Sequence, residues 1–407
     1  MELYVRNQYH TILSRIEEPR RFIQVIVGPR QVGKTTLVGQ VLKDSTIPCT
    51  SVNADAIDRQ DGDWIRRVWE SARVAMQIQH ENQHLLVVDE IQKIDDWSER
   101  VKAEWDRDSR EGRNLKVILL GSSRLLIKKG LSESLAGRFE LVRLSHWSLV
   151  EMRDAFGYTL DDYIYFGGYP GSAALKDDEK RWKRYIRDSL VAPAIEKDVI
   201  MTSNIYKPAL MKRTFELGCS YSSELLSLTK MVGQLQDAGN VTTIAGYLEI
   251  LKQSELLCGL QKYARDEARK YSSIPKFQVY NNALLTAYRG TTFFKDRQDT
   301  EAWGRWVESA VGAFLVSQTE ELGCQVYYWR ERADEVDFII SNGDVTLAIE
   351  VKSGRRAMNS GLPKFCDAFH PTRSFVVGTG GVPLEDFLSA NLEELLGLPE
   401  FGVTDKG

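Results

Sequence analysis

The segment Gly28-Pro-Arg-Gln-Val-Gly-Lys-Thr35 decides the fold of the N-terminal part, because it fits the pattern G-x-x-x-x-G-K-[ST] at every fixed position. An apolar stretch predicted as a strand, Phe22–Val27, precedes it, and a stretch predicted as a helix, Thr36–Lys43, follows it. In a strand, loop and helix of this kind, backbone amides and the helix N-terminus face the phosphates of a nucleotide. The sequence therefore predicts a site for ATP or GTP.

Each part of this loop has a chemical task. Lys34 is expected to neutralise the β- and γ-phosphate oxygens, and the Thr35 hydroxyl is expected to ligate Mg²⁺. The glycines let the backbone turn its amides inward around the β-phosphate. The candidate nucleotide-binding residues of the loop are Gly28, Pro29, Arg30, Gln31, Val32, Gly33, Lys34, Thr35 and Thr36.

The second half of the predicted site is Leu85-Leu-Val-Val-Asp89-Glu90. Four apolar residues predict a buried strand, and two carboxylates follow at its C-terminal end, where ligands bind in open α/β sheets. We expect Asp89 to hold Mg²⁺ and to belong to the nucleotide site, and Glu90 to orient and polarise the attacking water.

Two weaker candidates follow along the chain. Val117-Ile-Leu-Leu-Gly121 predicts a further strand, and Ser122 or Ser123 at its tip can sense the γ-phosphate or simply form a turn. The loop residue Arg138 can stabilise transition-state charge, in its own site or in that of a neighbouring subunit. The alternative for Arg138 is a plain surface arginine.

The region around these motifs, residues 21–145, alternates apolar strands with amphipathic helices. This order predicts an α/β fold with a parallel sheet that is covered on both faces. Several of the strands are continuous apolar runs, as expected for buried parallel strands. The predicted strands are Phe22–Val27, Pro48–Val52, Leu85–Val88, Val117–Leu120 and Leu141–Leu144.

Composition limits the classes of function. The 407 residues predict two or three domains, and a net charge of −4 argues against coating of nucleic acid by bulk charge, although a local basic face stays open. Five scattered cysteines without a CxxC pair predict neither a zinc site nor a disulfide framework. The polar N-terminus and the lack of an 18-residue apolar stretch predict a cytoplasmic protein with no membrane segment.

The middle of the chain, residues 150–285, is predicted to be mostly helical. A helix-turn-helix pattern from Tyr221 to Lys252 precedes a predicted strand pair, 256–260 and 277–280, with the basic residues Arg265, Arg269 and Lys270 between the strands. This order resembles a winged helix, whose second helix would read DNA. That helix has few cations, so a lid that only packs against the ATPase is an equal alternative.

A second candidate site lies near the C-terminus. Asn342-Gly343 predicts a hairpin between strands at 336–340 and 345–351. With a two-residue turn, Asp337 faces Ala348 and lies diagonal to Glu350, so that Asp337, Glu350 and Lys352 share one face. Two carboxylates and a lysine can hold Mg²⁺ and activate water against a phosphodiester.

Glu308, on a helix predicted over 303–318, is expected to complete this metal set with Asp337 and Glu350, while Lys352 takes a catalytic role. The set resembles the PD-(D/E)xK nuclease superfamily in residue type and order. A solvated hairpin face and a nuclease fold without activity are the alternatives. The same register places Glu335 opposite Glu350, which indicates either a further ligand or an error in the register.

Several motifs together resemble the AAA+ ATPases related to archaeal ATPases that carry a C-terminal DUF4143 region. The resemblance covers roughly residues 20–355 and implies ATP as the nucleotide. It also implies a homo-oligomer, such as a ring or a dimer. The motifs are Gly28–Thr36, Asp89-Glu-Ile-Gln92, Gly121-Ser-Ser123, Ser134-Leu-Ala-Gly-Arg138, Gly167-Gly-Tyr-Pro170, Trp329-Arg330, Glu335-Val-Asp337 and Glu350-Val-Lys352.

We therefore predict a three-part chain: an AAA+-type P-loop ATPase domain at 1–148, a helical lid and winged-helix-like domain at 149–285, and a restriction-nuclease-like α/β domain at 286–407. Two functions are open. In the first, Mg²⁺-dependent ATP hydrolysis controls DNA binding or a metal-dependent nuclease. In the second, the chain is an ATP-driven switch that binds a protein partner, and its nuclease fold is inert.

Overall fold

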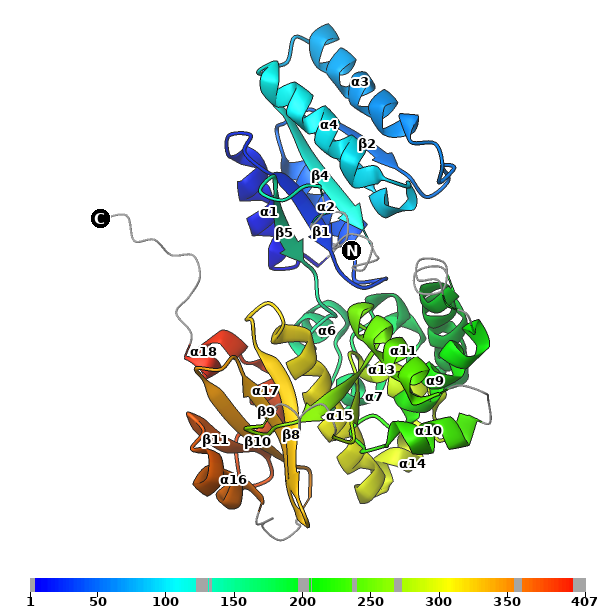
Figure 1. The fold of residues 1–407 in the computed structure, drawn as a ribbon, viewed down its shortest axis with the longest axis vertical. Coiled ribbons are helices and arrows are strands. Elements are labelled where there is room, and N and C mark those ends of the chain that lie inside the picture. The colour runs from blue at the N-terminus through cyan, green and yellow to red at the C-terminus, as the bar shows by residue number, and fades with distance from the viewer. Residues whose placement is uncertain are drawn as a thin grey trace, which may run out of the picture. The chain divides into compact units, whose positions relative to one another are not determined.

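The computed structural model describes residues 4–121, 131, 134–196, 205, 207–235, 240–266, 273–354 and 361–397. Its contacts divide the chain into two compact units, Met1–Ser145 and His146–Gly407 (Figure 1). Each unit has its own sheet.

The first unit is built on a five-stranded parallel sheet in the order β2-β3-β4-β1-β5. The α/β class and the five strands predicted from the sequence are confirmed, with bounds that differ by up to two residues. The strands are β1 (Ile23–Val27), β2 (Cys49–Asn53), β3 (His84–Asp89), β4 (Leu115–Gly121) and β5 (Phe139–Arg143). The inner strands β1, β3 and β4 are buried at every position, as their apolar runs predict.

Two helices cover one face of this sheet, where Trp69 of α3 and Trp105 of α4 pack against β1, β3 and β4. Successive strand residues point to opposite faces. Gln24 therefore faces the other side, where it accepts a hydrogen bond from Arg15 of α1. The helices of this unit are α1 (Gln8–Glu17), α2 (Lys34–Asp44), α3 (Asp63–Ile78), the 3₁₀ turn η1 (Ile91–Lys93) and α4 (Trp97–Arg110).

A buried ion cluster joins α3 to α4. The Arg73 guanidinium donates to Asp108 at 2.8 Å and to Glu104 at 2.7 Å, and its side chain is only 2% exposed. It also reaches Glu70 at 2.9 Å, a carboxylate shared with the half-exposed Arg107. Because the Arg73 charge is surrounded by carboxylates, its removal would leave buried negative charge without a partner.

The second unit contains a mixed six-stranded sheet in the order β11-β10-β9-β8-β6-β7. The helix α15 (Thr300–Gln318) packs on one face of it, and α16 (Gly361–Phe369) places Phe365 against the other. The strands are β6 (Leu257–Lys262), β7 (Lys276–Val279), β8 (Gln325–Glu331), β9 (Asp334–Ser341), β10 (Thr346–Lys352) and β11 (Arg373–Gly378).

Most of the remaining helices of this unit lie between residues 149 and 298, in agreement with the predicted helical middle. They are α6 (Leu149–Phe156), α7 (Leu160–Phe166), η2 (Pro170–Leu175), α8 (Glu179–Arg184), the π-helix η3 (Tyr185–Val191), α9 (Pro208–Ser220), α10 (Leu228–Leu235), α11 (Val241–Gln253), α13 (Asn282–Tyr288) and α14 (Phe293–Gln298), followed near the C-terminus by α17 (Leu384–Ser389) and α18 (Leu392–Leu396).

The strand pair that the sequence assigned to a winged helix is present as β6 and β7, but it extends the C-terminal sheet. β6 pairs with β8 in parallel through Gln261↔Tyr327 and Lys262↔Tyr328. The predicted boundary between residues 285 and 286 thus falls inside one compact unit.

The hairpin of β9 and β10 has a different register from the predicted one. Ser341 pairs with Thr346, so the loop has four residues instead of two, and Ile349 pairs with Phe338. The Asn342 side chain accepts the amides of residues 344 and 345 and stabilises this longer loop. Continuing the ladder by one step puts Asp337 directly opposite Glu350, two residues beyond the predicted partner Ala348.

The turn at Gly167-Gly168 has a structural task within this unit. A Cβ on Gly167 would lie 2.0 Å from the Asn281 side-chain oxygen, and one on Gly168 would lie 2.1 Å from the Trp147 carbonyl oxygen. The Gly168 amide donates to that same Asn281 oxygen at 3.1 Å. Only glycine leaves room for these contacts, which join the turn to the start of α13.

Candidate functional site

The phosphate loop connects β1 to α2 and requires glycine at two positions. A Cβ on Gly28 would lie 2.1 Å from the carbonyl oxygen of Leu144, the residue after β5. Gly33 has φ +89° at the start of α2, a conformation that other residues rarely adopt. The chain therefore turns sharply twice between the strand and the helix, and the first-turn residues Lys34, Thr35 and Thr36 begin α2.

Lys34 folds back over this loop. Its ammonium donates to the carbonyl oxygens of Gly28 at 2.9 Å and Pro29 at 2.8 Å, and the residue is 8% exposed. Arg6 fastens the loop from outside, because its guanidinium donates to the carbonyl oxygens of Val32 and Ser145. The sequence reasoning missed Arg6, since an isolated arginine 22 residues before the motif carries no pattern.

Thr35 and Asp89 meet although 54 residues separate them. The Thr35 hydroxyl donates to the Asp89 carboxylate at 2.8 Å. Asp89 ends β3, and Thr35 lies in the first turn of α2, after the loop that follows β1; β4 separates β1 from β3 in the sheet. A hydroxyl and a carboxylate in contact are oxygen donors of the kind that Mg²⁺ prefers, so these residues fit the ion.

Glu90 follows at the end of β3 in a left-handed conformation, with φ +54°. Its backbone amide donates to the Asp89 carboxylate at 2.8 Å, and its own carboxylate accepts a hydrogen bond from the Gln92 amide. The Gln92 side chain is buried at 5% exposure. Gln92, quoted in the sequence only as part of a motif, therefore restrains the candidate catalytic carboxylate.

The structure describes only one of the two weaker candidate sites of this unit. Ser122 and Ser123 lie outside the described residues, although β4 ends at Gly121 between the two halves of the site. Arg138 precedes β5, and its carbonyl accepts the amide of Ile23 at the start of β1. It therefore lies at the opposite end of the strands from the phosphate loop, where Asp106 binds its guanidinium at 2.8 and 3.1 Å. The structure does not bring Arg138 into its own site.

The C-terminal candidates are arranged around a lysine that the sequence reasoning did not consider. The Lys276 ammonium of β7 lies 2.5 Å from Glu308 and 3.9 Å from both Glu335 and Asp337. It also donates to the Asp337 backbone carbonyl at 3.2 Å. We call Glu308, Glu335 and Asp337, with Lys276 between them, the acidic pocket.

Glu350 and Lys352, the remaining members of the predicted set, bind each other at 2.6 Å. The second oxygen of Asp337 accepts the backbone amide of Val351 at 2.7 Å. Among the described residues, no three Asp, Glu, His or Cys side chains come together as metal ligands. The structure therefore does not bring Glu308, Asp337 and Glu350 together as metal ligands; they contact Lys276, the Val351 amide and Lys352 respectively.

Burial and like charge act on the pKa of Glu308. Burial raises the pKa of this carboxyl to about 8, and the nearby carboxylates of Asp337 and Glu335 act in the same direction, although Lys276 lowers it. Three acids share one ammonium here. The single positive charge of Lys276 therefore cannot neutralise all of them.

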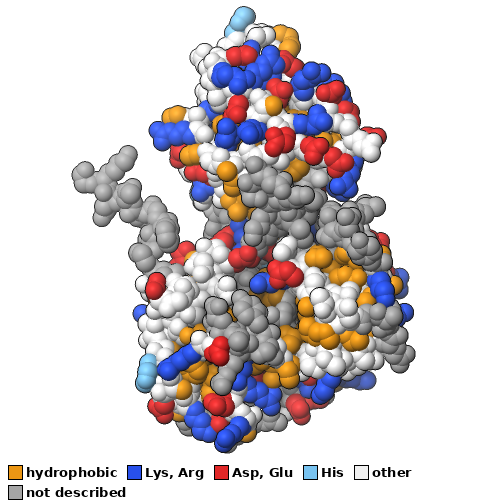
Figure 2. All heavy atoms as spheres, viewed as in Figure 1, with side chains coloured by type: hydrophobic (Ala, Val, Ile, Leu, Met, Phe, Trp, Pro, Cys, Tyr) orange, Lys and Arg blue, Asp and Glu red, His pale blue; other side chains and the backbone are white. Residues whose placement is uncertain are grey.

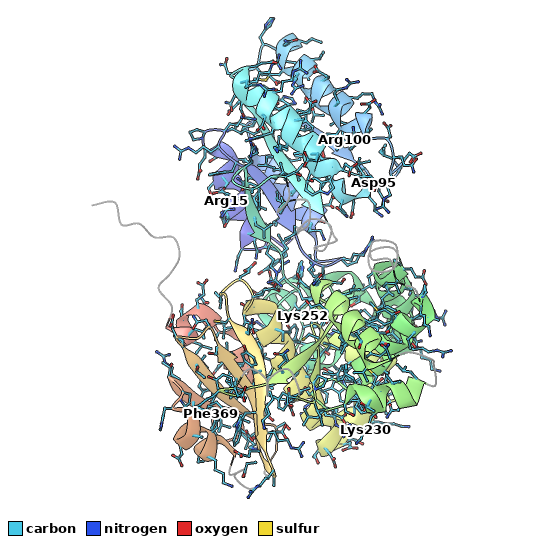
Figure 3. The ribbon with its side chains drawn as sticks, in the orientation of Figure 1. Arg15, Asp95, Arg100, Lys230, Lys252 and Phe369 are labelled. Carbon is cyan, nitrogen blue, oxygen red and sulfur yellow. The ribbon has the colours of Figure 1, made fainter. Side chains whose placement is uncertain are left out.

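The candidate reader helix, α11, buries Ile244, Tyr247, Leu248 and Leu251. Its exposed positions are small, apolar or mixed in charge: Val241, Thr242, Ala245, Gly246, Glu249 and Lys252. Arg265 donates to the Ala368 carbonyl and lies over the ring of Phe369, the residue labelled in Figure 3. Arg269 and Lys270 lie outside the described residues.

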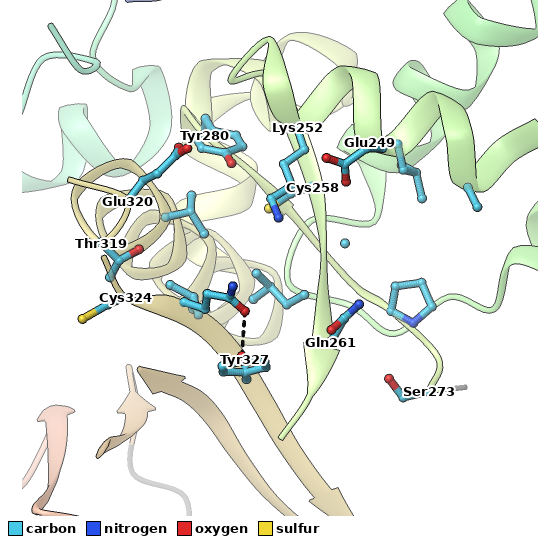
Figure 4. A pocket seen from close by; sticks show the side chains of 18 of the residues that line it. Glu249, Lys252, Cys258, Gln261, Ser273, Tyr280, Thr319, Glu320, Cys324 and Tyr327 are labelled. Atoms are coloured by element: carbon cyan, nitrogen blue, oxygen red, sulfur yellow. Dashed lines mark hydrogen bonds between the residues drawn. The ribbon is translucent and has the colours of Figure 1, made fainter. Parts of the chain in front are cut away.

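A pocket of about 620 Å³ opens beside α11, where β6 and β8 diverge (Figure 4). Charges of both signs surround it, from Glu249 and Lys252 on α11 and from Glu320 after α15. No motif in the sequence pointed to it, because its walls come from several segments that are far apart in the sequence. On the first unit, Figure 2 likewise shows Lys, Arg, Asp and Glu side chains interspersed over the face in view.

Comparisons with known proteins match three consecutive parts of the chain. Residues 20–153 match a family described as an AAA domain, and 303–394 match a domain of unknown function, DUF4143. These two matches confirm the predicted resemblance. Between them, residues 157–294 match another domain of unknown function, DUF8612, which the sequence analysis did not foresee.

Two similar proteins are uncharacterized proteins of Mycobacterium bovis and of Mycobacterium tuberculosis. Each is 27% identical over 357 residues, which cover 84% of this chain and 73% of theirs. In the described part of the chain, every helix is too short or too polar to cross a membrane.

Proposed function

We propose that this chain, with an AAA domain at its N-terminus and a DUF4143 domain at its C-terminus, hydrolyses ATP with Mg²⁺ at the phosphate loop. An AAA domain indicates ATP binding and hydrolysis in general. The observation that supports the site is the contact of Thr35 with Asp89 at 2.8 Å. It brings the phosphate loop and the end of β3 together, and each contributes one oxygen suited to a metal ion.

The positions of the residues support the following roles. When a nucleotide enters, the Lys34 ammonium leaves the carbonyl oxygens of Gly28 and Pro29 and binds the β- and γ-phosphate oxygens. Thr35 and Asp89 would hold Mg²⁺, which would supply positive charge next to the transferred phosphoryl group. Glu90 leaves Gln92, orients the attacking water and accepts its proton. Ser122, which follows β4 in the sequence, is the candidate sensor of the γ-phosphate.

The test compares ATP binding and turnover by the wild type, Lys34→Ala and Asp89→Asn. Lys43→Ala is the matched control, because this lysine is exposed in the last turn of the same helix. We expect Lys34→Ala to lose binding or turnover and the control to keep both. Full turnover by Lys34→Ala would reject the site. Competition with GTP measures the choice of base.

We further propose that the ATP cycle controls binding of a protein partner by residues 146–407. The exposed positions of α11 favour this function over DNA processing, because small and oppositely charged side chains do not match a phosphate backbone. Phosphate-binding surfaces need clustered Arg and Lys, whereas α11 presents one exposed lysine close to an exposed glutamate.

The rival function is tested by incubating the protein with plasmid and linear DNA, with Mg²⁺ or Mn²⁺, with and without ATP. Asp337→Ala and Lys352→Ala variants serve as controls. We expect no cleavage, and no DNA binding whose affinity depends on salt. Cleavage that both variants lose would instead establish a nuclease that the ATPase regulates.

A further inference from the structure

The acidic pocket of the second unit contains a cation supplied by the chain itself. Lys276 places its ammonium among three carboxylates that come from α15 and β9, at 2.5, 3.9 and 3.9 Å. A metal-dependent site of this type would need an oxygen-rich space for a divalent ion. In this chain, the centre of that space holds the end of a lysine side chain.

We propose that Lys276 is the resident cation of the acidic pocket, that it takes the position a divalent metal would need, and that the C-terminal sheet is therefore a metal-independent binding module. This inference does not depend on the ATPase of the first unit. It concerns only the chemistry that the DUF4143 region can perform.

The donor set around Lys276 supports the proposal. A divalent ion needs several oxygen ligands that are free to turn toward it. Glu308 is bound to the ammonium, and one Asp337 oxygen is bound to the Val351 amide. Glu350, which faces Asp337 across the hairpin, is paired with Lys352. A metal at this place would have to break several of these contacts at once.

The position of Lys276 in the fold prevents an easy exchange. The residue is 1% exposed, and all four residues of β7 are buried. Its backbone pairs with Leu260 of β6, and its ammonium lies 4.8 Å from the centre of the Phe338 ring. The side chain therefore cannot swing into solvent without opening the sheet, and the ammonium stays where a metal would bind.

Electrostatics also act against a second cation, because the Lys276 ammonium already lies among the carboxylates of Glu308, Asp337 and Glu335. A charged ammonium and a divalent ion at the same position repel each other. The two cations therefore exclude each other, and the covalently attached one is always present.

The experiment measures Mn²⁺ binding to the full chain without nucleotide, from the loss of the free Mn²⁺ signal in electron paramagnetic resonance. All proteins carry Asp89→Asn, which removes the metal ligand of the phosphate loop. The parent protein should bind no Mn²⁺ with a Kd below about 1 mM. Adding Lys276→Met should create one Mn²⁺ site per chain and lower the Tm by roughly 10 °C in EDTA, a loss that Mn²⁺ partly reverses.

Two controls separate the ammonium from a general change of charge. Lys352→Met removes an equal charge next to the pocket and should create no Mn²⁺ site. Lys276→Met with Glu308→Gln removes one carboxylate as well and should weaken the new site. A folded Lys276→Met protein that gains no Mn²⁺ site would overturn the proposal.

A second measurement does not depend on the folding of Lys276→Met. If the parent protein binds Mn²⁺ and Asp337→Asn abolishes that binding, the acidic pocket is a metal site despite its lysine, and the proposal is wrong. If neither protein binds Mn²⁺, the acidic pocket excludes the metal as proposed, and the gain of a site in Lys276→Met assigns this exclusion to the lysine.

Discussion

Replacement of Glu90 by glutamine tests the proposed hydrolysis most directly. Gln keeps the size of the side chain and still accepts the hydrogen bond from Gln92, but it cannot accept a proton from water. The left-handed backbone at residue 90 and its amide contact with Asp89 do not involve the Glu90 carboxylate. Glu90→Gln should therefore preserve the geometry of the loop and leave ATP affinity within about twofold of the wild type.

The expected loss can be set against the contact that the structure shows. A positioned general base contributes about 10²- to 10⁴-fold to a rate, so kcat should fall by that factor, or about 3–5 kcal/mol. The Gln92–Glu90 hydrogen bond to a charged group is worth about 1.5–3 kcal/mol. Gln92→Ala should therefore change kcat by at most about 100-fold, even though it touches the same carboxylate.

The assay is release of inorganic phosphate at saturating ATP, with affinity measured separately from the fluorescence of a labelled nucleotide. Glu111→Gln, beyond the far end of α4 and exposed, is the matched control and should keep wild-type turnover. If Glu90→Gln retained more than about one tenth of the wild-type kcat, Glu90 would not be the base, and another group would have to accept the proton.

Three further outcomes follow from contacts in the first unit. Arg73→Met should lower the free energy of unfolding by about 3–5 kcal/mol in urea titrations, whereas Arg107→Met, at a half-exposed partner of the same cluster, should cost less than about 1 kcal/mol; equal losses would mean that burial does not matter. Gly28→Ala should weaken ATP binding at least about tenfold, because its Cβ would collide with a backbone carbonyl, and unchanged affinity would show that the loop shifts freely. Arg138→Ala should slow ATP turnover and leave ATP binding unchanged. If Arg138 serves a neighbouring subunit, a mixture of the Arg138→Ala and Lys34→Ala proteins should regain turnover. Unchanged turnover by Arg138→Ala would show that Arg138 is only a surface residue.

The N-terminal unit was largely predictable because its signals are local. The phosphate loop fixes a strand, a turn and a helix within about 20 residues, and the Asp89-Glu90 pair marks the end of a second strand. The amphipathic helices and buried strands follow from their periodicity. Arg6 could not be found in this way, because it reaches the loop only through tertiary contacts.

The C-terminal site could be predicted only in part. The hairpin was found, but a four-residue loop in place of the assumed two-residue turn moved Asp337 opposite Glu350. The predicted Glu335–Glu350 pair was a sign of that register error. Lys276 was missed because it lies on β7, in a segment that the sequence assigned to another domain. The residues next to it in the sequence give no sign of its contact with Glu308, 32 residues away.

Because β6 and β7 complete the C-terminal sheet, they determine where the chain can be divided into fragments without breaking a sheet. A fragment beginning at residue 286 would lose both strands and leave the edge of β8 open to pairing with another chain. In such a fragment, Glu308 and Asp337 would also lack their contact with the Lys276 ammonium. We expect such a fragment to self-associate, whereas a cut between Ser145 and His146 keeps each sheet whole.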